Sequence, residues 1–187
     1  MSLEFTVPGI NPQSPTYVAV DTNVLLDRAE SDEDILDCLA TIRERVENHC
    51  FAVLPTVIQE LQDLSELSGP GIGGSDWKRK RDLAGTALDN ILNWRFQPIN
   101  FVPVRHGIVE QAARKIRERG IIPMDQITDS LIVSEAAALP SALLISSDAH
   151  ICGLDKEALN FELAAAHLAR ISVYSPRELV RMFFRKR

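Results

Sequence analysis

Four acidic residues that lie far apart in the chain are candidates for binding a divalent metal ion: Asp21, Glu60, Asp129 and Asp148. Asp21 and Asp148 each follow a short apolar segment with the pattern of a buried strand. Carboxylates gathered around one cavity repel one another unless a cation lies between them, and hard divalent cations prefer oxygen ligands. The residue types therefore indicate a site for Mg2+ or Mn2+.

Asp129 is the most informative of the four because of its place on a predicted helix over residues 124–139. On that helix it shares a face with Ile132, Val133 and Ala136. An isolated charge on an apolar face is costly. Either the carboxyl group is neutralised, or it pairs with a cation, or the face borders a wet cleft. We favour the cation.

Apolar periodicity predicts strands that alternate with helices along the chain. We expect strands at 17–20, 51–54, 99–104, 142–146 and 171–174. Helices are expected at 31–48 with Ser31 as N-cap, from Pro55, at 77–94, 106–119 and 124–139, within 156–169, and from Pro176. This order predicts an α/β fold, a three-layer α/β/α sandwich with a central parallel sheet.

In an open sheet of this kind, ligands bind outside the carboxyl ends of the strands, where the strand order reverses. Asp21 and Asp148 are expected at that edge, and Glu60 and Asp129 on helices that point toward the same rim. Three of the four acids also have a simpler interpretation, and Asp129 is the exception. Asp21 and Asp148 can cap the helices that follow them, and Glu60 can be a solvated residue at the edge of a helix face.

The bulk composition is that of an ordinary globular protein, with 187 residues, 45% hydrophobic and 25% charged. We expect a flexible N-terminal lead-in over residues 1–15 and a single domain over 16–187. No apolar run is long enough to cross a bilayer, no secretory signal is evident, and three cysteines form no CxxC pair. These features predict a cytoplasmic protein without a membrane partner.

The formal net charge of −6 disfavours a polyanionic partner, yet basic residues are clustered locally. Lys78, Arg79, Lys80 and Arg81 directly follow Trp77, and cations beside an aromatic ring suit backbone phosphates and a stacked base. The alternative is a solvated helix start with a half-buried tryptophan.

Several segments resemble the PIN-domain nuclease family, including its VapC-like and PilT N-terminus-like members. The stretch from Val20 to Leu26, VDTNVLL, is similar to the family's opening motif, and Glu60 in VIQEL to its early acidic position. Asp129-Ser130-Leu131-Ile132 opens a segment similar to the family's Asp-x-Leu-Ile helix, and Ser146-Ser147-Asp148 is similar to its strand-terminal motif. The four segments occur in the family's order.

The resemblance implies a metal-dependent endoribonuclease that cuts single-stranded RNA, in many bacteria as the toxin of a toxin–antitoxin pair. It implies that Asp21, Asp129 and Asp148 hold Mg2+ or Mn2+ together with Glu60. Asp125 departs from the family's pattern: it lies four residues before Asp129 on the same predicted helix face and can replace or supplement it as a ligand. Thr22, Asn23 and Ser146 would orient these ligands by hydrogen bonds. An antitoxin protein and a second copy of the chain are the protein partners that it implies.

Two alternatives come from other classes of protein. One is a PIN-like module that binds RNA or a protein without cutting. Such a module has no need to keep all four acids. The other is a phosphate-signalling receiver domain, which requires paired acids near the first strand's end and a lysine after a late strand, and neither is clear here.

Overall fold

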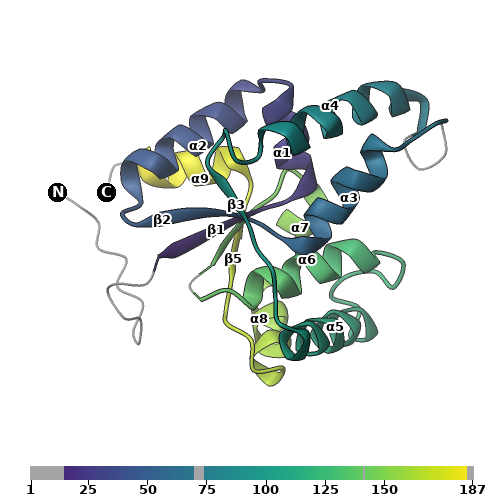
Figure 1. Cartoon of the computed structure of the whole chain (residues 1–187). Helices are drawn as coiled ribbons and strands as arrows, with labels where there is room; N and C mark the ends of the chain where they lie inside the picture. Colours follow the sequence, from purple (N-terminus) through teal and green to yellow (C-terminus); the bar gives the residue numbers. More distant parts are fainter. Residues whose placement is uncertain (1–14, 70–73, 141, 185–187) are drawn as a thin grey trace.

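A computed structural model describes residues 15–69, 74–140 and 142–184, and in these residues the chain forms a five-stranded parallel sheet covered by helices on both faces (Figure 1). The strand order is β3-β2-β1-β4-β5. The strands are β1 (Thr16–Val20), β2 (His49–Val53), β3 (Phe96–Pro98), β4 (Leu143–Ile145) and β5 (Ser172–Tyr174). The predicted three-layer α/β/α sandwich with a parallel sheet is confirmed. The predicted lead-in lies outside the described residues, except for Pro15.

The helices form two layers. On one side, α2 (Glu33–Arg45) packs against α9 (Pro176–Phe184), and α1 (Thr22–Ala29) against α4 (Trp77–Asn90). On the other, α6 (Ile127–Ala137) and α8 (Lys156–Ala165) both pack against α5 (Pro103–Glu118). The helix α3 (Pro55–Ser65) contacts both α4 and α6. It therefore lies where the two helix layers meet.

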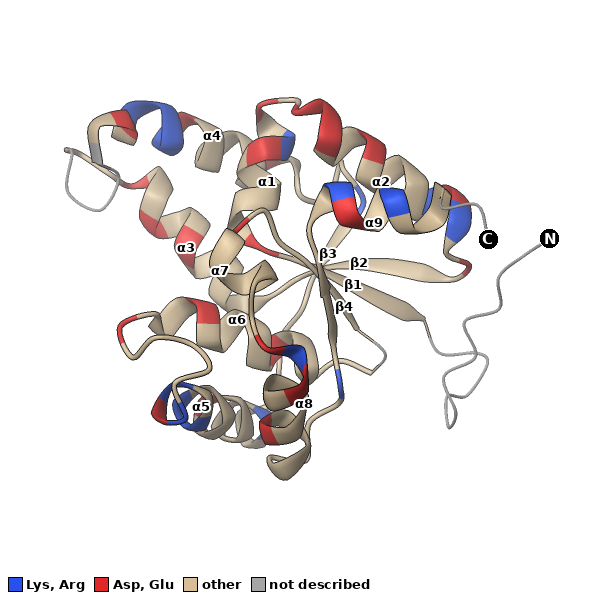
Figure 2. Cartoon of the chain, turned by 180° about the vertical axis from the view of Figure 1, so that it is seen from behind, with Lys and Arg blue, Asp and Glu red and all other residues tan. Residues whose placement is uncertain are grey.

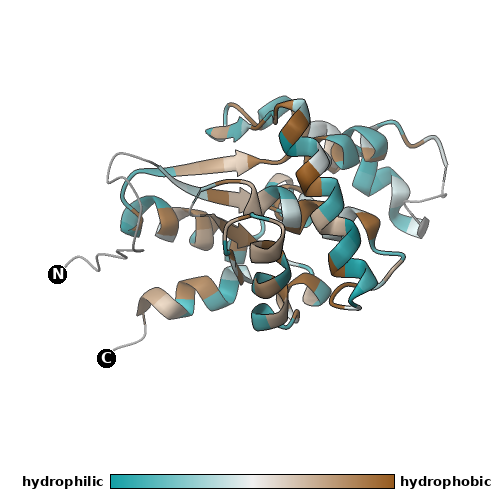
Figure 3. Cartoon of the chain, turned by 90° about the horizontal axis from the view of Figure 1, so that it is seen from below, coloured by the Kyte–Doolittle hydropathy of each residue, from teal (hydrophilic) through white to brown (hydrophobic). Residues whose placement is uncertain are grey.

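The central strands are apolar almost without interruption because helices cover both faces of the sheet. Val18, Ala19 and Val20 of β1 are fully buried, and Val20 is in register with Val53 of β2 and Ile145 of β4. Figure 3 shows mainly apolar colours along the strands, while the connections carry both hydrophilic and hydrophobic residues. This registered core holds the ends of β1 and β4 side by side.

The prediction of a strand at residues 99–104 is wrong. The edge strand β3 ends at Pro98, and the only ladder-like bond beyond it in this segment is from the Ile99 amide to the carbonyl oxygen of Val53, at 2.9 Å. Ile99 and Phe101 are apolar because they pack on the core, and Pro103 then begins α5 as its first helical residue. Apolar character without alternation does not distinguish a strand from a packed connection.

The helix predicted at residues 31–48 is confirmed but shorter, since α2 spans Glu33–Arg45. The N-cap of α2 is Asp32, whose carboxylate accepts a hydrogen bond from the Ile35 amide at 3.1 Å. Ser31, predicted as the cap, instead has a φ of 64° in the turn between α1 and α2. The helix also ends earlier than predicted, at Arg45.

Two short helical elements complete the described chain, a 3-10 turn at Gly74–Asp76 and the helix α7 (Ala149–Cys152). Four residues are too few for periodicity to reveal, so the sequence did not predict α7. Among the described residues, no helix has both the length and the apolar character needed to cross a membrane.

Candidate functional site

The site lies where the strand order reverses. From β1 the chain continues to β2 on one side of it, while β4 lies on the other side. Asp21 follows β1 and Asp148 follows the extended segment after β4, and the Asp21 amide donates to the carbonyl oxygen of Ile145 at 3.0 Å. Both acids therefore stand at the carboxyl edge of adjacent strands, the usual ligand-binding position in an open α/β sheet.

Asp21 is a buried carboxylate, with 3% of its surface exposed. Its Oδ1 accepts a hydrogen bond from the Thr22 amide at 2.5 Å, and its Oδ2 accepts one from the Ser146 hydroxyl at 2.6 Å. Burial raises the pKa of Asp21 to about 6, against the opposing effect of these hydrogen bonds, and repulsion from Asp129 and Asp148 adds to the rise. The group is held in place but poorly solvated.

Glu60 approaches the same place from α3. It is half-buried and accepts a hydrogen bond from the hydroxyl of Thr22, whose amide is bonded to Asp21. Burial raises the pKa of Glu60 to about 7, and the charges of Asp21 and Asp129 raise it further, while the bond from Thr22 opposes the rise. Thr22 thus links two acids that are 39 positions apart along the chain.

Asp129 lies on α6 and is half-buried at the margin of a cavity of about 270 Å3. Burial raises its pKa, the charge of Asp148 adds to the rise, and the charge of His150 opposes it. On the same helix Ile132, Val133 and Ala136 are buried, as predicted. Of the three explanations for an acid on this face, the structure provides the cleft directly.

Asp148 is the N-cap of α7 and accepts a hydrogen bond from the His150 amide at 2.6 Å. Its own amide donates to the Ser146 hydroxyl oxygen at 3.0 Å. Ser146 is fully buried, and its hydroxyl accepts from Asp148 while it donates to Asp21. One serine side chain therefore connects the two strand-terminal acids.

Hydrogen bonds join Asp21 to Glu60 through Thr22 and to Asp148 through Ser146, while Asp129 interacts with the group through its charge. Each of Asp21, Glu60 and Asp129 has its pKa raised by the charge of at least one other member of the group. Four hard oxygen donors with mutual repulsion fit a divalent cation in their chemistry. As the side chains stand, however, no three acid, histidine or cysteine side chains in the described ranges are arranged to hold a metal ion. A cation would need some of them to rotate.

The capping interpretation holds for Asp21 and Asp148, since each accepts a hydrogen bond from an amide of the helix that it precedes. Capping alone does not account for the burial of Asp21, because a cap needs only one oxygen and can remain solvated. The second oxygen of Asp21 is used for a contact across the sheet, to Ser146.

Two other predicted residues lie less centrally. Asn23 is exposed, and its side chain makes no hydrogen bond with another described residue. Asp125 is exposed in the connection before α6, which begins at Ile127, so the expectation that it shares a helix face with Asp129 is wrong. The Gln126 amide donates to the carbonyl oxygen of Pro123 at 3.1 Å, so residues 123–126 form a turn and the helix begins after it.

The basic cluster begins α4, which packs on α1 and α3. Figure 2 shows Lys and Arg gathered there and on α5 and α9. Arg79 forms an ion pair with Glu30, and Arg81 with Asp82. Lys78 and Arg81 lie over the half-buried ring of Trp77, at 5.7 and 5.4 Å from its centroid. Two of the four cations therefore have acidic partners within the chain.

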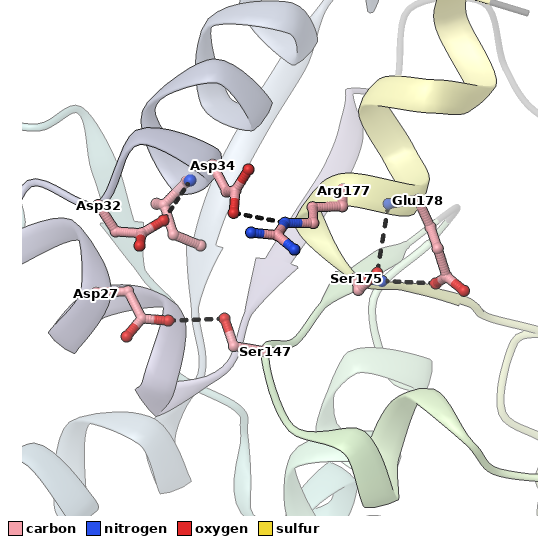
Figure 4. Close-up of polar contacts among 8 residues, drawn as sticks. Asp27, Asp32, Asp34, Ser147, Ser175, Arg177 and Glu178 are labelled. Carbon is pink, nitrogen blue, oxygen red and sulfur yellow. Dashed lines mark hydrogen bonds and ion pairs between the residues drawn. The ribbon is translucent and has the colours of Figure 1, made fainter.

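Asp27 is a further acid near the site that the sequence did not single out. It lies on α1, half-buried, and its Oδ2 accepts a hydrogen bond from the Ser147 hydroxyl at 2.8 Å (Figure 4). Burial is the main cause of its raised pKa. This contact fixes the residue between Ser146 and Asp148. No local signal reveals it, since the partners are 120 residues apart.

Glu135 is the second acid that sequence reasoning missed. It lies on α6, is 2% exposed, and accepts hydrogen bonds from the amide and hydroxyl of Thr56, at 3.1 and 2.9 Å. Burial raises its pKa. The contact joins the first turn of α3, which carries Glu60, to the helix that carries Asp129.

Comparison with known proteins supports the fold. No family model matches the chain, and no curated protein matches it. Among solved structures, a chain in the crystal structure of VapBC2 from Rickettsia felis bound to a DNA fragment from their promoter has a similar fold, with a TM-score of 0.54 and 17% sequence identity. The match covers 85% of this chain and 98% of that chain. At this identity the likeness establishes a shared fold.

Proposed function

We propose that the chain is a Mg2+- or Mn2+-dependent endoribonuclease that hydrolyses phosphodiester bonds in single-stranded RNA. The observation that carries the proposal is the convergence of Asp21, Glu60, Asp129 and Asp148 at the switch point of the sheet, with raised pKa values for three of them. Carboxylates whose pKa values are raised by burial and by one another's charge are typical of a functional site.

The roles of the side chains follow from their surroundings. Asp21, Asp129 and Asp148 would hold the metal ion, and Glu60 would hold a water molecule beside it. When bound, a divalent ion lowers the pKa of water and offsets charge on phosphate oxygens. Thr22 and Ser146 would keep the carboxylates in orientation, since each hydrogen bonds to one or two of them.

The test is incubation of the purified protein with a mixed RNA pool in Mg2+, in Mn2+ and in EDTA. We expect cleavage of single-stranded RNA in either metal ion and none in EDTA. Asp21→Asn, with an unchanged circular dichroism spectrum, should abolish cleavage. An Asp21→Asn protein with full magnesium-dependent activity would refute the assignment, because Asp21 is the most buried of the four acids.

A second candidate function is an RNA- or protein-binding PIN-like module that does not cut. One observation favours it: among described residues, the acids as they stand do not form a three-ligand metal site, and hydrogen bonds from the chain already occupy both Asp21 oxygens. Isothermal titration with Mn2+ separates the candidates. A binding module would take up no Mn2+ at the site, whereas the nuclease requires uptake that Asp21→Asn removes.

Protein partners are part of the proposal. The fold shared with a chain of the VapBC2 structure supports an antitoxin partner, a toxin role and self-association. A small reading frame immediately upstream of the gene, whose product co-purifies with this chain and inhibits cleavage, is the expected finding for the toxin. Light scattering on the isolated chain tests for a homodimer. Action on cellular RNA would place the protein in the cytoplasm.

A further inference from the structure

The cavity beside Asp129 has the form of a binding site in its own right. It measures about 270 Å3 and lies between the segment before α6 and the segment formed by α7 and the residues after it. Its apolar walls are Ile121, Ile122 and Pro123 on one side and Ile151 and Leu154 on the other. Ile122 and Ile151 are 2% and 1% exposed, so their positions are set by the core. We call this cavity the Asp129 cavity.

The polar groups of the Asp129 cavity are two carboxylates and one imidazole. They belong to Asp129, Asp155 and His150, and among the described residues no lysine or arginine lines the cavity. A phosphate group would be repelled there. A flat ring bearing amino groups fits better, because it can stack on apolar and imidazole surfaces while carboxylates accept its N–H bonds.

Asp155 is available for such an interaction. It is exposed, and its Oδ1 accepts hydrogen bonds from the amides of Glu157 and Ala158, at 3.0 and 3.1 Å, as the N-cap of α8. Its Oδ2 accepts none from a described residue. This oxygen can therefore accept from a ligand without loss of the cap.

His150 forms the exposed part of the cavity. Its backbone amide is bonded to Asp148, so the residue is anchored to the acidic site while the imidazole is free of described hydrogen-bond partners. Gly153 lines the same wall, and a Cβ there would lie 2.9 Å from the carbonyl oxygen of Ala149. The wall thus combines a fixed backbone with a solvent-facing ring.

We infer that the Asp129 cavity holds one nucleobase of the RNA next to the phosphate that is cut, with a preference for bases that carry an amino group, such as cytosine, over uracil. This inference rests on the proposed function, which it deepens by naming a base-binding subsite. Asp129 would border both the metal ion and the base. Asp155 would accept from the amino group, and His150 would stack on the ring.

A binding experiment without metal or phosphate tests the cavity apart from cleavage. Cytidine, uridine and ribose are titrated into protein with 13C-labelled methyl groups, in EDTA. We expect millimolar cytidine to shift the methyl signals of Ile121, Ile151 and Leu154, uridine to bind several-fold more weakly, and ribose to cause no shift. Equal effects of cytidine and ribose, or shifts confined to other methyl groups, would overturn the inference.

Variants assign the interaction. Leu154→Trp should fill the cavity and weaken cytidine binding by about tenfold or more. Leu92→Trp, at a residue that is 73% exposed and does not line the cavity, is the matched control and should bind cytidine normally. His150→Ala changes an exposed side chain, so it tests the same cavity without risk to the core, and His150→Phe should restore binding. Normal cytidine binding by the His150→Ala variant would show that the imidazole of His150 does not stack on the base.

Asp155→Asn tests the base preference. Asn also serves as an N-cap, so α8 should remain intact. The amide can donate as well as accept, and the preference for cytidine over uridine should fall to near parity. An unchanged preference in this variant would exclude Asp155 as the acceptor.

The last experiment measures cleavage of RNA oligonucleotides that carry a single abasic nucleotide at successive positions. An abasic nucleotide next to the cut should lower kcat/KM by about tenfold or more, and one several positions away should not. If no RNA is cut while cytidine still binds, the proposed function fails and base binding stands. If RNA is cut and neither the abasic position nor cytidine has an effect, the base subsite alone fails.

Discussion

The hydroxyl of Ser146 lies 2.6 Å from Oδ2 of Asp21 and joins the ends of two adjacent strands at the switch point of the sheet. The same hydroxyl oxygen accepts a hydrogen bond from the Asp148 amide at 3.0 Å. Because the serine is fully buried, water cannot replace either bond. The mutual orientation of two candidate metal ligands therefore depends on one side chain.

Ser146→Ala should weaken Mn2+ binding by about 10–100-fold, the usual effect of removing a group that orients a ligand. The free energy of unfolding should fall by about 1–3 kcal/mol, because the Asp148 amide loses its acceptor. Ser134→Ala is the matched control, since Ser134 is equally buried and its hydroxyl has no partner in the described structure. Titration calorimetry and urea unfolding provide the measurements. Equal effects of the two substitutions would contradict the role of Ser146.

Without metal, the protein should lose stability as the pH rises from 4 to 8. The pKa values of Asp21 and Glu60 are raised from 3.8 and 4.5 to about 6 and about 7, so the folded chain binds protons more tightly than the unfolded chain. Their contribution is complete below pH 4 and is lost through pH 6 to 7. For buried Asp21 it is on the order of 3 kcal/mol.

Thermal unfolding in EDTA at pH 5 and pH 8 measures this loss, and Mg2+ at pH 8 should restore stability by binding the folded state. The double variant Asp21→Asn, Glu60→Gln should show a flatter pH profile and no response to Mg2+. A wild-type unfolding midpoint that is the same at both pH values in EDTA would show that folding does not raise the pKa values of Asp21 and Glu60.

Asp27→Asn should lower kcat several-fold with little change in KM, because Asp27 accepts the Ser147 hydroxyl and so positions the residue before Asp148. Ser147→Ala should have the same effect. The double variant should lose no more activity than either single variant, because both substitutions remove the same hydrogen bond. Asp37→Asn, at an exposed residue of α2, is the control. Additive losses in the double variant would show that the two residues act separately.

Glu135→Ala should lower the free energy of unfolding by about 2–3 kcal/mol, because the amide and hydroxyl of half-buried Thr56 lose the buried carboxylate that accepts their hydrogen bonds. Glu135→Gln retains an acceptor oxygen and should cost less. Glu110→Ala, at an exposed residue of α5, is the control for helix propensity. Urea unfolding measures all three, and a cost for Glu135→Ala no larger than that of Glu110→Ala would exclude the contact between α3 and α6 as a stabilising one.

The double charge reversal Lys78→Glu, Lys80→Glu should weaken RNA binding and reduce its salt dependence. Arg79 and Arg81 have acidic partners, whereas the two lysines form no ion pair within the described ranges. Loss of two phosphate contacts should reduce the slope of log K against log salt by about 0.7 for each contact. Lys115→Glu on α5 is the control. An unchanged affinity and slope would show that Lys78 and Lys80 are simply solvated.

The alternation of elements was predictable because it depends on local periodicity. The continuous apolar strands β1 and β2, the proline at the start of α3 and the buried face of α6 are all visible within short windows. The residue range of β3 and the existence of α7 were not predictable from the sequence. An apolar connection such as 99–102 packs on the core as a strand does, and four residues complete barely one helical turn.

The sequence by itself determined that Asp21 and Asp148 would meet, because each follows a strand of a parallel sheet and carboxyl ends share one edge. Only the tertiary structure decided the contacts that position them. Asp27 with Ser147 and Glu135 with Thr56 are 120 and 79 residues apart. The Asp129 cavity likewise forms between two segments that do not adjoin in the chain. Periodicity shows which face of an element is buried, whereas side-chain pairing across elements depends on how the folded layers pack.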